Sequence, residues 1–292
     1  GSASITLTDA SAVSTAATSA ANNAAPTDIS LSATTIAENA SSLTFTATST
    51  DDSSTSFTYA LSGTDASYFT LNSSTGVLTL KSSPDYETKT SYSITLATSD
   101  DATIPKSYSE DFTITVTDVN EAPTVSSTAV TSATEDAAYS YTFAASDVDS
   151  GDTITYAAPT LPSWLSFNTT TGVLSGTPTN SDVGDHSIIL TATDAAGKVD
   201  TQSFTITVTN TNDAPTVANA ISDQSVAEDS ALNLQFAADV FNDIDAGDSL
   251  TYSATLSDGS ALPSWLSFDT NTRTFSGTPA NVDVGAIDVK VT

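Results

Sequence analysis

A short stretch rich in acidic and amide side chains, followed by Ala-Pro-Thr, recurs along the chain and sets its organisation. It spans residues 118–125 and 210–217, and a weaker form spans residues 21–27. Each of the first two copies follows a run in which apolar residues alternate with Thr, at 112–116 and at 204–208. Proline lacks a backbone N–H and restricts φ, so it ends a strand. We therefore interpret the stretch as a linker between folded domains.

The spacing of the linkers predicts the domain count. The linker prolines Pro26, Pro123 and Pro215 lie 97 and 92 residues apart, a period of tandem domains and not of solenoid repeats. A chain of 292 residues, 38% of them hydrophobic, is long enough for two or three domains that each bury a core. The predicted parts are an N-terminal arm or the tail of a preceding domain at 1–25, and domains at 26–121, 122–213 and 214–292.

Within each domain, apolar residues alternate with Thr or Ser, the pattern of a strand with one buried face. Turn-forming residues separate these runs, so the sequence predicts an all-β fold of tandem antiparallel Greek-key β-sandwiches with about seven strands each. The predicted strands are 43–47, 57–61, 77–80, 92–96, 112–116, 141–145, 154–156, 173–174, 188–192, 204–208, 232–236, 250–252, 274–275 and 287–291.

The last domain is expected to lack its final strand, because nothing after residue 291 matches the run 204–208. A sandwich short of a strand exposes sheet edges. Either the chain stops early, or another chain supplies the strand. Residues 5–8 alternate suitably for such a donor, which would be a head-to-tail β-augmentation.

The charge of the chain restricts its partners. There are 35 Asp and Glu residues against 6 Lys and Arg, a formal net charge of −29. This excess argues against nucleic acid and anionic membranes as partners and favours cations. The absence of cysteine excludes disulfides and thiol chemistry. No apolar run approaches the roughly 20 residues needed to span a bilayer, and no signal peptide is visible, so we expect a soluble fragment whose export signal or anchor lies elsewhere.

Acidic residues recur at matching places in the domains. The loops 147–152 and 243–248 share the spacing Asp-x-Asp-x-Gly-Asp. Alternate aspartates with a glycine that bends the loop suit calcium, which takes six to eight oxygen ligands. The other matching sets are Glu38, Glu135 and Glu228; Asp85, Glu87 and Asp182; and Asp100 and Asp194.

These motifs carry a family resemblance. Residues 26–121 resemble a cadherin repeat, with Ala-Glu-Asn at 37–39, Asp-Tyr-Glu at 85–87 and the linker Asp-Val-Asn-Glu-Ala-Pro. Residues 122–213 and 214–292 resemble the dystroglycan-type cadherin-like and Ig-type domains of bacterial surface adhesins. Their hallmark is Leu-Pro-Ser-Trp-Leu-Ser-Phe at 161–167, repeated at 262–268, followed by Ser-Gly-Thr-Pro.

The resemblance implies calcium ions at each junction between domains. The ligands it implies for the first junction are Glu38, Asp85, Glu87, Asp118, Asn120, Glu121, Asp147, Asp149 and Asp194. Those for the second junction are Glu135, Asp182, Asn210, Asn212, Asp213, Asp243 and Asp245.

Departures from the family pattern make the junctions unequal. Gly184 stands where the glutamate of Asp-x-Glu would be, and Asn210 replaces the linker aspartate, so we expect fewer or weaker ions at the second junction. The pairs 22–23 and 51–52 do not reproduce the ligand pattern, so no well-formed calcium site is expected at the N-terminal face of the first domain.

Three residues outside these sets have side chains suited to other roles. Trp164 and Trp265 could stack on sugars, but their apolar surroundings favour a core position. His186 is the single histidine and is expected to be exposed, since one histidine makes neither a triad nor a zinc site. Glycoside hydrolysis needs an acid held in an apolar pocket, whereas these carboxylates lie in loops, so we do not expect an enzyme.

The sequence thus predicts a calcium-stiffened extender or stalk segment of a secreted or cell-surface adhesin, extracellular and involved in cell adhesion. Two alternatives stay open. One is a module that binds carbohydrate or itself directly, with surface polysaccharide or copies of the chain as partners. The other is a filament or surface-layer subunit that assembles by strand donation.

Overall fold

The computed structural model describes residues 23–41, 44–52 and 54–292. The chain forms two compact units. The first unit comprises residues 1–123 with the loops 147–153 and 194–198, and the second comprises the remaining residues up to 292. The strand predicted at residues 5–8, and with it the strand-donation hypothesis, lies outside the described residues.

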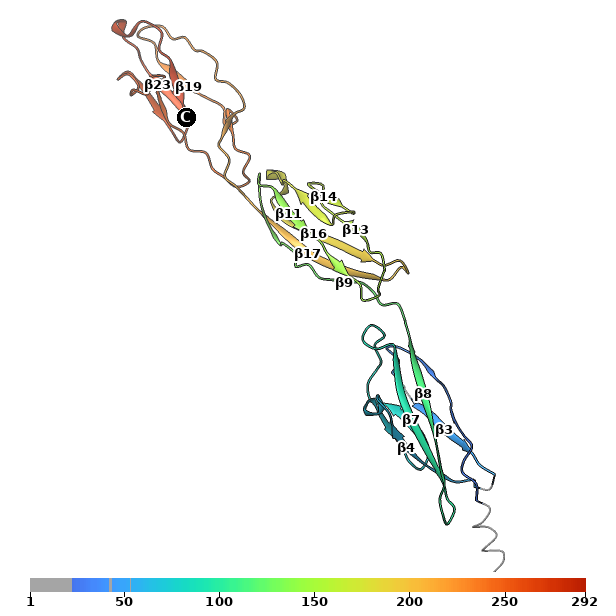
Figure 1. The fold of residues 1–292 in the computed structure, drawn as a ribbon. Helices are drawn as coiled ribbons and strands as arrows, with labels where there is room; N and C mark the ends of the chain where they lie inside the picture. The colour runs from blue at the N-terminus through green and yellow to red at the C-terminus, as the bar shows by residue number, and fades with distance from the viewer. Residues whose placement is uncertain (1–22, 42–43, 53) are drawn as a thin grey trace, which may run out of the picture. The chain divides into compact units, whose positions relative to one another are not determined.

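The first unit contains a sandwich of two four-stranded sheets, with strand orders β1-β3-β6-β5 and β2-β8-β7-β4. We call it the first sandwich, and Figure 1 shows its long strands β7 and β8 lying side by side. Its strands are β1 (Asp28–Leu31), β2 (Thr35–Ala37), β3 (Thr44–Thr50), β4 (Phe57–Ser62), β5 (Phe69–Leu71), β6 (Val77–Leu80), β7 (Ser91–Asp100) and β8 (Ser107–Thr117), with a 3₁₀ helix η1 (Ala66–Tyr68) before β5.

Alternation along β7 explains how the first sandwich holds together. Every second side chain of this strand is buried, and Leu96 is fully buried together with Leu78 and Ile114 from two other strands. The Thr and Ser residues between them face outward, where their β-branched or small side chains fit a pleated surface. The predicted all-β fold is confirmed, although the buried face of β7 also includes Thr98 and Asp100.

The second unit begins with the second sandwich, whose main sheets have the orders β10-β17-β16-β13 and β11-β15-β14, with β9 and β12 paired beside them. Leu174, Leu190 and Ile206 are fully buried at its centre. Its strands are β9 (Thr124–Val125), β10 (Ser132–Thr134), β11 (Tyr139–Thr142), β12 (Ala145–Ser146), β13 (Thr155–Thr160), β14 (Leu165–Asn168), β15 (Val173–Gly176), β16 (Gly184–Thr193) and β17 (Val199–Thr209), with a 3₁₀ helix η2 (Asn180–Asp182).

The third sandwich, also in the second unit, has a smaller core. Four described side chains are buried there, Phe236, Val240, Leu266 and Phe275. Its sheets are β19-β23-β22, β21-β24 and β18-β20. Its strands are β18 (Thr216–Val217), β19 (Leu232–Gln235), β20 (Phe241–Asn242), β21 (Ala254–Leu256), β22 (Leu266–Asp269), β23 (Thr274–Gly277) and β24 (Val289–Val291), with a 3₁₀ helix η3 (Asn281–Asp283).

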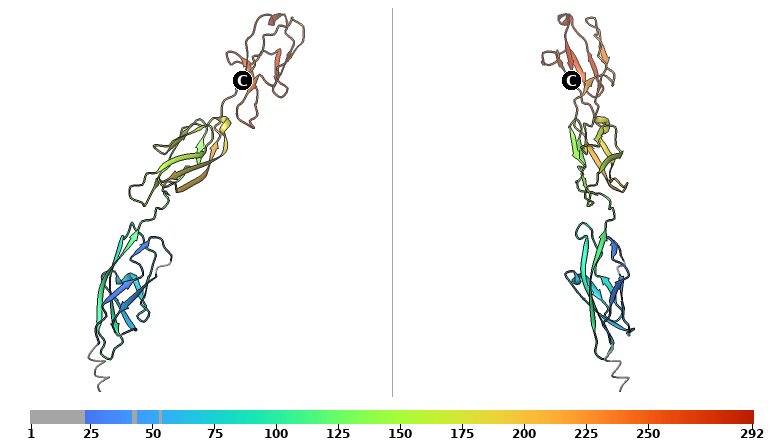
Figure 2. Two further views of the ribbon diagram at one scale, coloured as in Figure 1. Left: turned by 90° about the vertical axis from the view of Figure 1, so that its right-hand side faces the viewer. Right: turned by 45° about the vertical axis from the view of Figure 1, so that its right-hand side comes forward.

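Two expectations about strands need correction. The strand predicted at 250–252 is wrong, because the chain becomes a strand only at β21, whose ladder faces β24. Tyr252 nevertheless packs against the third core, so the apolar residue in this run does face the interior. The sheets are also not wholly antiparallel, since β2 pairs in parallel with β8 and β10 in parallel with β17. Figure 2 shows the strands from two further sides.

The tryptophans pack as predicted, and the histidine does not. Trp164 and Trp265 are partly buried against the second and third cores. His186 was expected to be exposed but is half-buried. Its ring lies edge-on to that of Trp164, with 5.8 Å between the ring centroids. Its Nε2 lies 2.6 Å from the carbonyl oxygen of Asp182. Over the described residues, no helix is long and apolar enough to cross a bilayer.

Substituting Gly176 by alanine is expected to cost about 3 kcal/mol of unfolding free energy. A Cβ at Gly176 would lie 2.1 Å from the Trp164 carbonyl oxygen, and one at Gly277 would lie 1.9 Å from that of Trp265. These obstacles are backbone atoms, which a rotamer change cannot move. Urea unfolding followed by tryptophan fluorescence would measure the loss in G176A, with Ser175→Ala as the control. A G176A variant as stable as S175A would contradict the prediction.

Candidate metal centres

A left-handed residue fixes a glutamate at one end of each sandwich. Asn39, Asp136 and Asp229 have φ values of 57°, 57° and 59°. Asn and Asp tolerate this region better than other non-glycine residues. The backbone N–H of each donates to the carbonyl of a proline, Pro84, Pro178 and Pro279 respectively, at 2.8–3.0 Å. The glutamate before each of them is thereby held beside a second loop of the same sandwich.

Glu38 is the most firmly held of these glutamates. Its side chain is 3% exposed. Its Oε1 accepts the backbone N–H of Val119 and its Oε2 that of Tyr86, both at 2.8 Å. Glu38 therefore ties the linker after β8 to the loop that carries Asp85 and Glu87.

Acidic side chains of the first unit converge in three groups around Glu38 and the linker. Within each group the carboxylate oxygens lie within 4.8 Å of one another, and Glu87 belongs to two groups. All contributing segments, including the loops 147–153 and 194–198, belong to the first unit. We call this set, together with Glu121, the first acidic site; its grouped members are Glu38, Asp85, Glu87, Asp118, Asp147, Asp149, Asp152 and Asp194.

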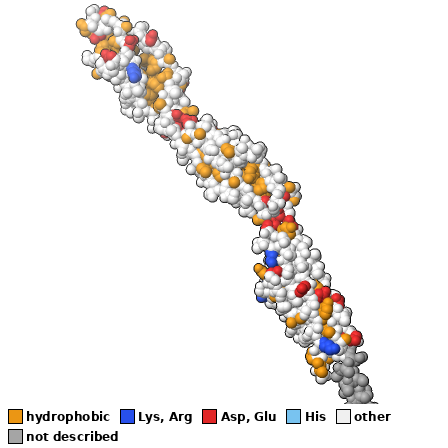
Figure 3. Space-filling model, viewed as in Figure 1, with side chains coloured by type: hydrophobic (Ala, Val, Ile, Leu, Met, Phe, Trp, Pro, Cys, Tyr) orange, Lys and Arg blue, Asp and Glu red, His pale blue; other side chains and the backbone are white. Residues whose placement is uncertain are grey.

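Four carboxylate oxygens of the first acidic site are buried without a hydrogen-bond partner. They are Oε2 of Glu121, Oδ2 of Asp147, Oδ1 of Asp149 and Oδ2 of Asp152. Buried polar atoms normally have partners, because burying an unpaired one costs free energy. Hard cations such as calcium, bound at these groups, would supply partners for such oxygens, so the residues present fit calcium. Figure 3 shows acidic side chains gathered in separate red patches on an otherwise largely uncharged surface.

Crowding also shifts the acidities of this site. Desolvation, followed by the charge of Asp149, raises the pKa of Asp118. Desolvation also leads the causes that raise the pKa of Glu121 and of Asp152, followed by the charges of Glu38 and Asp147 respectively. Asp194 differs, because the hydrogen bond from the Asn120 amide outweighs burial and lowers its pKa.

The raised pKa values predict an unusual pH dependence without metal. A carboxyl group whose pKa is raised by folding stabilises the fold at low pH and loses that contribution as pH rises through the folded-state pKa. The metal-free first unit should therefore melt at a higher temperature near pH 5 than near pH 7. Groups with lowered pKa, such as Asp194, lose their contribution only below their ordinary pKa of about 4, outside this window.

Scanning calorimetry in metal-free buffer would test this dependence. In saturating calcium the trend should reverse, because protons then compete with the ion for the same oxygens. The prediction is contradicted if the melting temperature in metal-free buffer is lower at pH 5 than at pH 7. Carboxylate repulsion would then not limit the stability of the unit.

The second acidic site lies wholly in the second unit and is smaller. Its two groups are Glu135, Asp136 and Asp213, and Asp243, Asp245 and Asp248. The backbone N–H of Asp213 donates to Oδ2 of Asp245 at 2.7 Å, which links the groups, and the Asn180 amide donates to the other oxygen of Asp245 at 3.0 Å. Among the described residues, no carboxylate oxygen of this site is buried without a partner.

Among the predicted acidic ligands, Asp182 lies outside both acidic sites, and the three predicted asparagines make hydrogen bonds within the protein. Asp182 accepts the N–H and hydroxyl of Thr179, which lowers its pKa. Asn120 donates to Asp194, Asn210 accepts from Asn180, and Asn212 donates to the carbonyl of Asp213. The acidic sites also contain three residues absent from the predicted ligand sets: Asp136, Asp152 and Asp248.

Two signals in the sequence could have found these three residues. Asp152 and Asp248 complete the Asp-x-Asp-x-Gly-Asp spacing of their loops. Asp136 follows Glu135 just as Asp229 follows Glu228.

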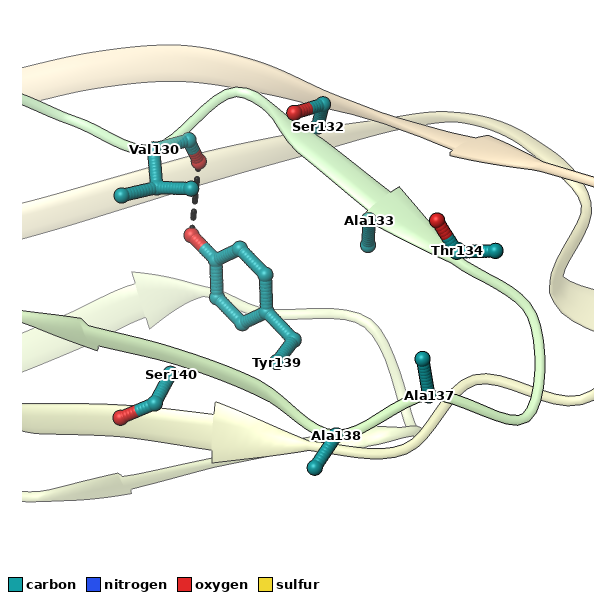
Figure 4. Close-up of a pocket in the computed structure, with 8 residues that line it drawn as sticks. All are labelled: Val130, Ser132, Ala133, Thr134, Ala137, Ala138, Tyr139 and Ser140. Atoms are coloured by element: carbon teal, nitrogen blue, oxygen red, sulfur yellow. Dashed lines mark hydrogen bonds between the residues drawn. The ribbon is translucent and has the colours of Figure 1, made fainter.

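A shallow groove in the second sandwich offers no such chemistry. It measures about 270 Å³ and is lined by β10, β11 and the turn between them. Figure 4 shows the ring of Tyr139 in it, with the hydroxyl donating to the Val130 carbonyl at 2.7 Å. The other lining side chains are short, among them Ala133, Ala137 and Ser140. The acidic sites are therefore the better candidates.

Fold and sites together define a class of protein: tandem β-sandwiches with acidic loops at their ends. The chain belongs to the family described as Putative Ig domain, whose pattern matches residues 122–209 and 214–292. The pattern described as Cadherin domain matches residues 32–117. The resemblance to a cadherin repeat followed by two Ig-type domains is thereby confirmed.

Among curated proteins, the chain is similar to the "Serine-rich adhesin for platelets" of Staphylococcus aureus. With strain USA300 it shares 36% identity over 137 residues, which are 47% of this chain and 6% of the relative. With strain MRSA252 the identity is also 36% over 137 residues, covering 9% of the relative. The match thus spans a small part of these much longer adhesins.

Among solved structures, the fold is similar to those of a mouse cadherin and a protocadherin. Mouse cadherin-23 EC22–24 gives a TM-score of 0.56 at 19% identity, covering 86% of this chain and 88% of that one. Protocadherin gamma B7 domains 1–4 gives a TM-score of 0.54 at 21% identity, covering 92% and 75%. At these identities the likeness concerns the fold.

Proposed function

We propose that this chain is an extender segment of an extracellular, cell-surface adhesin, stiffened by calcium ions bound at its acidic sites. The observation that carries the proposal is the set of four buried carboxylate oxygens without partners in the first acidic site. Membership in the Ig-type family, the match to the Cadherin domain pattern and the similarity to a staphylococcal adhesin support a non-catalytic role in cell adhesion.

Charge supplies the mechanism of stiffening. Without an ion, the carboxylates of the linker and of the loops 147–153 and 194–198 repel one another. A divalent ion bound among them neutralises this repulsion and fixes the linker against both loops. The linker then no longer acts as a hinge. An adhesin needs this property in order to hold a binding head away from the cell surface.

The two acidic sites should bind calcium with different strength. The first site has unpartnered buried oxygens, whereas the described oxygens of the second are exposed or hydrogen-bonded to the protein. An ion at the second site would have to displace some of these hydrogen bonds. This difference agrees with the weaker second site expected from Gly184 and Asn210.

Calcium titration by calorimetry would test the proposal. The variant Asp147→Asn with Asp152→Asn removes two charges from the first site and should weaken its binding at least tenfold, about 1.4 kcal/mol. Asp111→Asn is the matched control, since Asp111 is an exposed residue of β8 that bonds to Thr95. No binding heat with the unmodified chain at millimolar calcium, or equal affinity in the double variant, would overturn the proposal.

A further inference from the structure

Two of the chain's six Lys and Arg residues, Lys106 and Lys198, each take part in a similar set of hydrogen bonds at a different linker. At residue 120 of the linker, the Asn120 side-chain amide donates to Oδ2 of Asp194, while the Lys198 ammonium donates to the Asn120 carbonyl. At residue 23, the Asn23 amide donates to Oδ2 of Asp100, while the Lys106 ammonium donates to the Asn23 carbonyl. We call this arrangement the Asn–Asp–Lys clip.

The clip at residue 23 is built into the first sandwich. Asn23 is 9% exposed and Asp100 is 4% exposed. Lys106 and Asp100 close the hairpin between β7 and β8, because the Asp100 N–H donates to the Lys106 carbonyl and Oδ1 of Asp100 accepts the Lys106 N–H, both at 3.1 Å. The Asn23 amide also donates to the carbonyl of Ile104 at 3.2 Å. Both polar ends of Asn23 are therefore bonded to one hairpin.

The surroundings of the two clips differ in negative charge. The clip at Asn120 adjoins the group Asp147, Asp152 and Asp194, whose charge one lysine does not balance. Over the described residues, no metal-holding group of acidic side chains includes Asp100. In the clip at residue 23, the Lys106 ammonium meets the Asn23 carbonyl, and Oδ2 of Asp100 already accepts the Asn23 amide.

From this contrast we infer that Lys106 holds the segment 23–27 on the first sandwich without any metal ion. The segment is the weaker copy of the linker and leads into β1, where the Thr27 N–H donates to the Thr50 carbonyl at 2.9 Å. The chain thus has two kinds of linker attachment, one dependent on calcium under the proposed function and one dependent on lysine. The calcium dependence of the linker at residue 120 rests on that proposed function, and the attachment by Lys106 does not.

Hydrogen exchange measured by mass spectrometry on the full chain, with calcium and with EDTA, tests the inference. The amides of Thr27 and Ile29 report on the clip, and amides in β7 and β8 report on the fold. In the unmodified chain, protection at Thr27 and Ile29 should be equal in both buffers. Asn23→Ala and Lys106→Met should speed exchange there at least tenfold in both buffers, while Lys198→Met should leave it unchanged.

Three outcomes would overturn the inference: EDTA lowering the protection of Thr27 and Ile29 in the unmodified chain, both variants exchanging at the unmodified rate, or both speeding exchange equally throughout β7 and β8. The last would mean loss of the sandwich rather than of the clip. Exchange at residues 118–122 is read in the same experiment. If calcium has no effect there, the proposed function fails while the clip stands on its own variants.

Discussion

Adding EDTA to the calcium-loaded chain is expected to lower the melting temperature of the first unit by about 10 °C. An ion that binds only the folded state at a hundredfold excess over its Kd contributes about 2.7 kcal/mol, and 1 kcal/mol shifts the melting temperature of a unit of this size by about 4 °C. The physical cause is the first acidic site, where four buried carboxylate oxygens have no partner within the protein. Scanning calorimetry measures the shift directly.

Small-angle scattering should report the same change as flexibility. In calcium the scattering should fit a narrow set of conformations, and in EDTA a broader set, because the linker is released from the loops 147–153 and 194–198. The double variant of Asp147 and Asp152 is the control and should respond little to EDTA. Identical melting and scattering curves with and without EDTA in the unmodified chain would contradict calcium stiffening.

Replacing Glu38 by alanine is expected to cost about 3–5 kcal/mol of unfolding free energy. The substitution leaves the backbone N–H groups of Tyr86 and Val119 without their acceptor next to a buried position. Both hydrogen bonds are partly buried, and the loss of a hydrogen bond to a charged group costs about 1.5–3 kcal/mol. Glu38→Gln keeps the shape and one acceptor oxygen, so it should cost less than Glu38→Ala and separate hydrogen bonding from charge.

The chain offers a matched series for this experiment. Glu135 is equally buried but accepts a single backbone N–H, that of Thr211, at 3.1 Å, so Glu135→Ala should cost about half as much. Glu228 is exposed, so Glu228→Ala should cost less than about 0.5 kcal/mol. Both tryptophans lie outside the first sandwich, at residues 164 and 265, so tryptophan fluorescence would not report on its unfolding. The stability of E38A should therefore be measured by hydrogen exchange in β2 and β8. Equal losses for the three variants would refute the hydrogen-bond explanation.

Much of the fold could be predicted because it depends on local pattern. Alternation in β7 and β8 follows from the requirement that one face of a strand be buried, and it appears directly in the order of residues. The strand predicted at 250–252 failed because a strand also needs a facing strand, which alternation does not reveal. The parallel pairing of β2 with β8 was equally invisible, since it joins segments about 80 residues apart.

The candidate sites were predictable in part for a related reason. The spacing Asp-x-Asp-x-Gly-Asp and the linker motif mark side chains that share a short loop, and Asp147, Asp149 and Asp243 do lie beside other acidic side chains. Asp182 occupies the position in the second domain that Asp85 occupies in the first. Its carboxylate instead accepts hydrogen bonds from the backbone N–H and the hydroxyl of Thr179. The half-buried position of His186 was missed because it depends on Trp164, which precedes it by more than 20 residues.

The order of residues was enough to establish the sandwich class, the linkers and the excess of negative charge, since these follow from alternation, proline and composition. Three-dimensional packing established which carboxylates meet, which of their oxygens lack a partner, and that a lysine attaches residue 23 where acidic groups hold residue 120. The physical reason is that desolvation and hydrogen bonding act over a few ångströms in space, between residues that the chain separates by tens of positions.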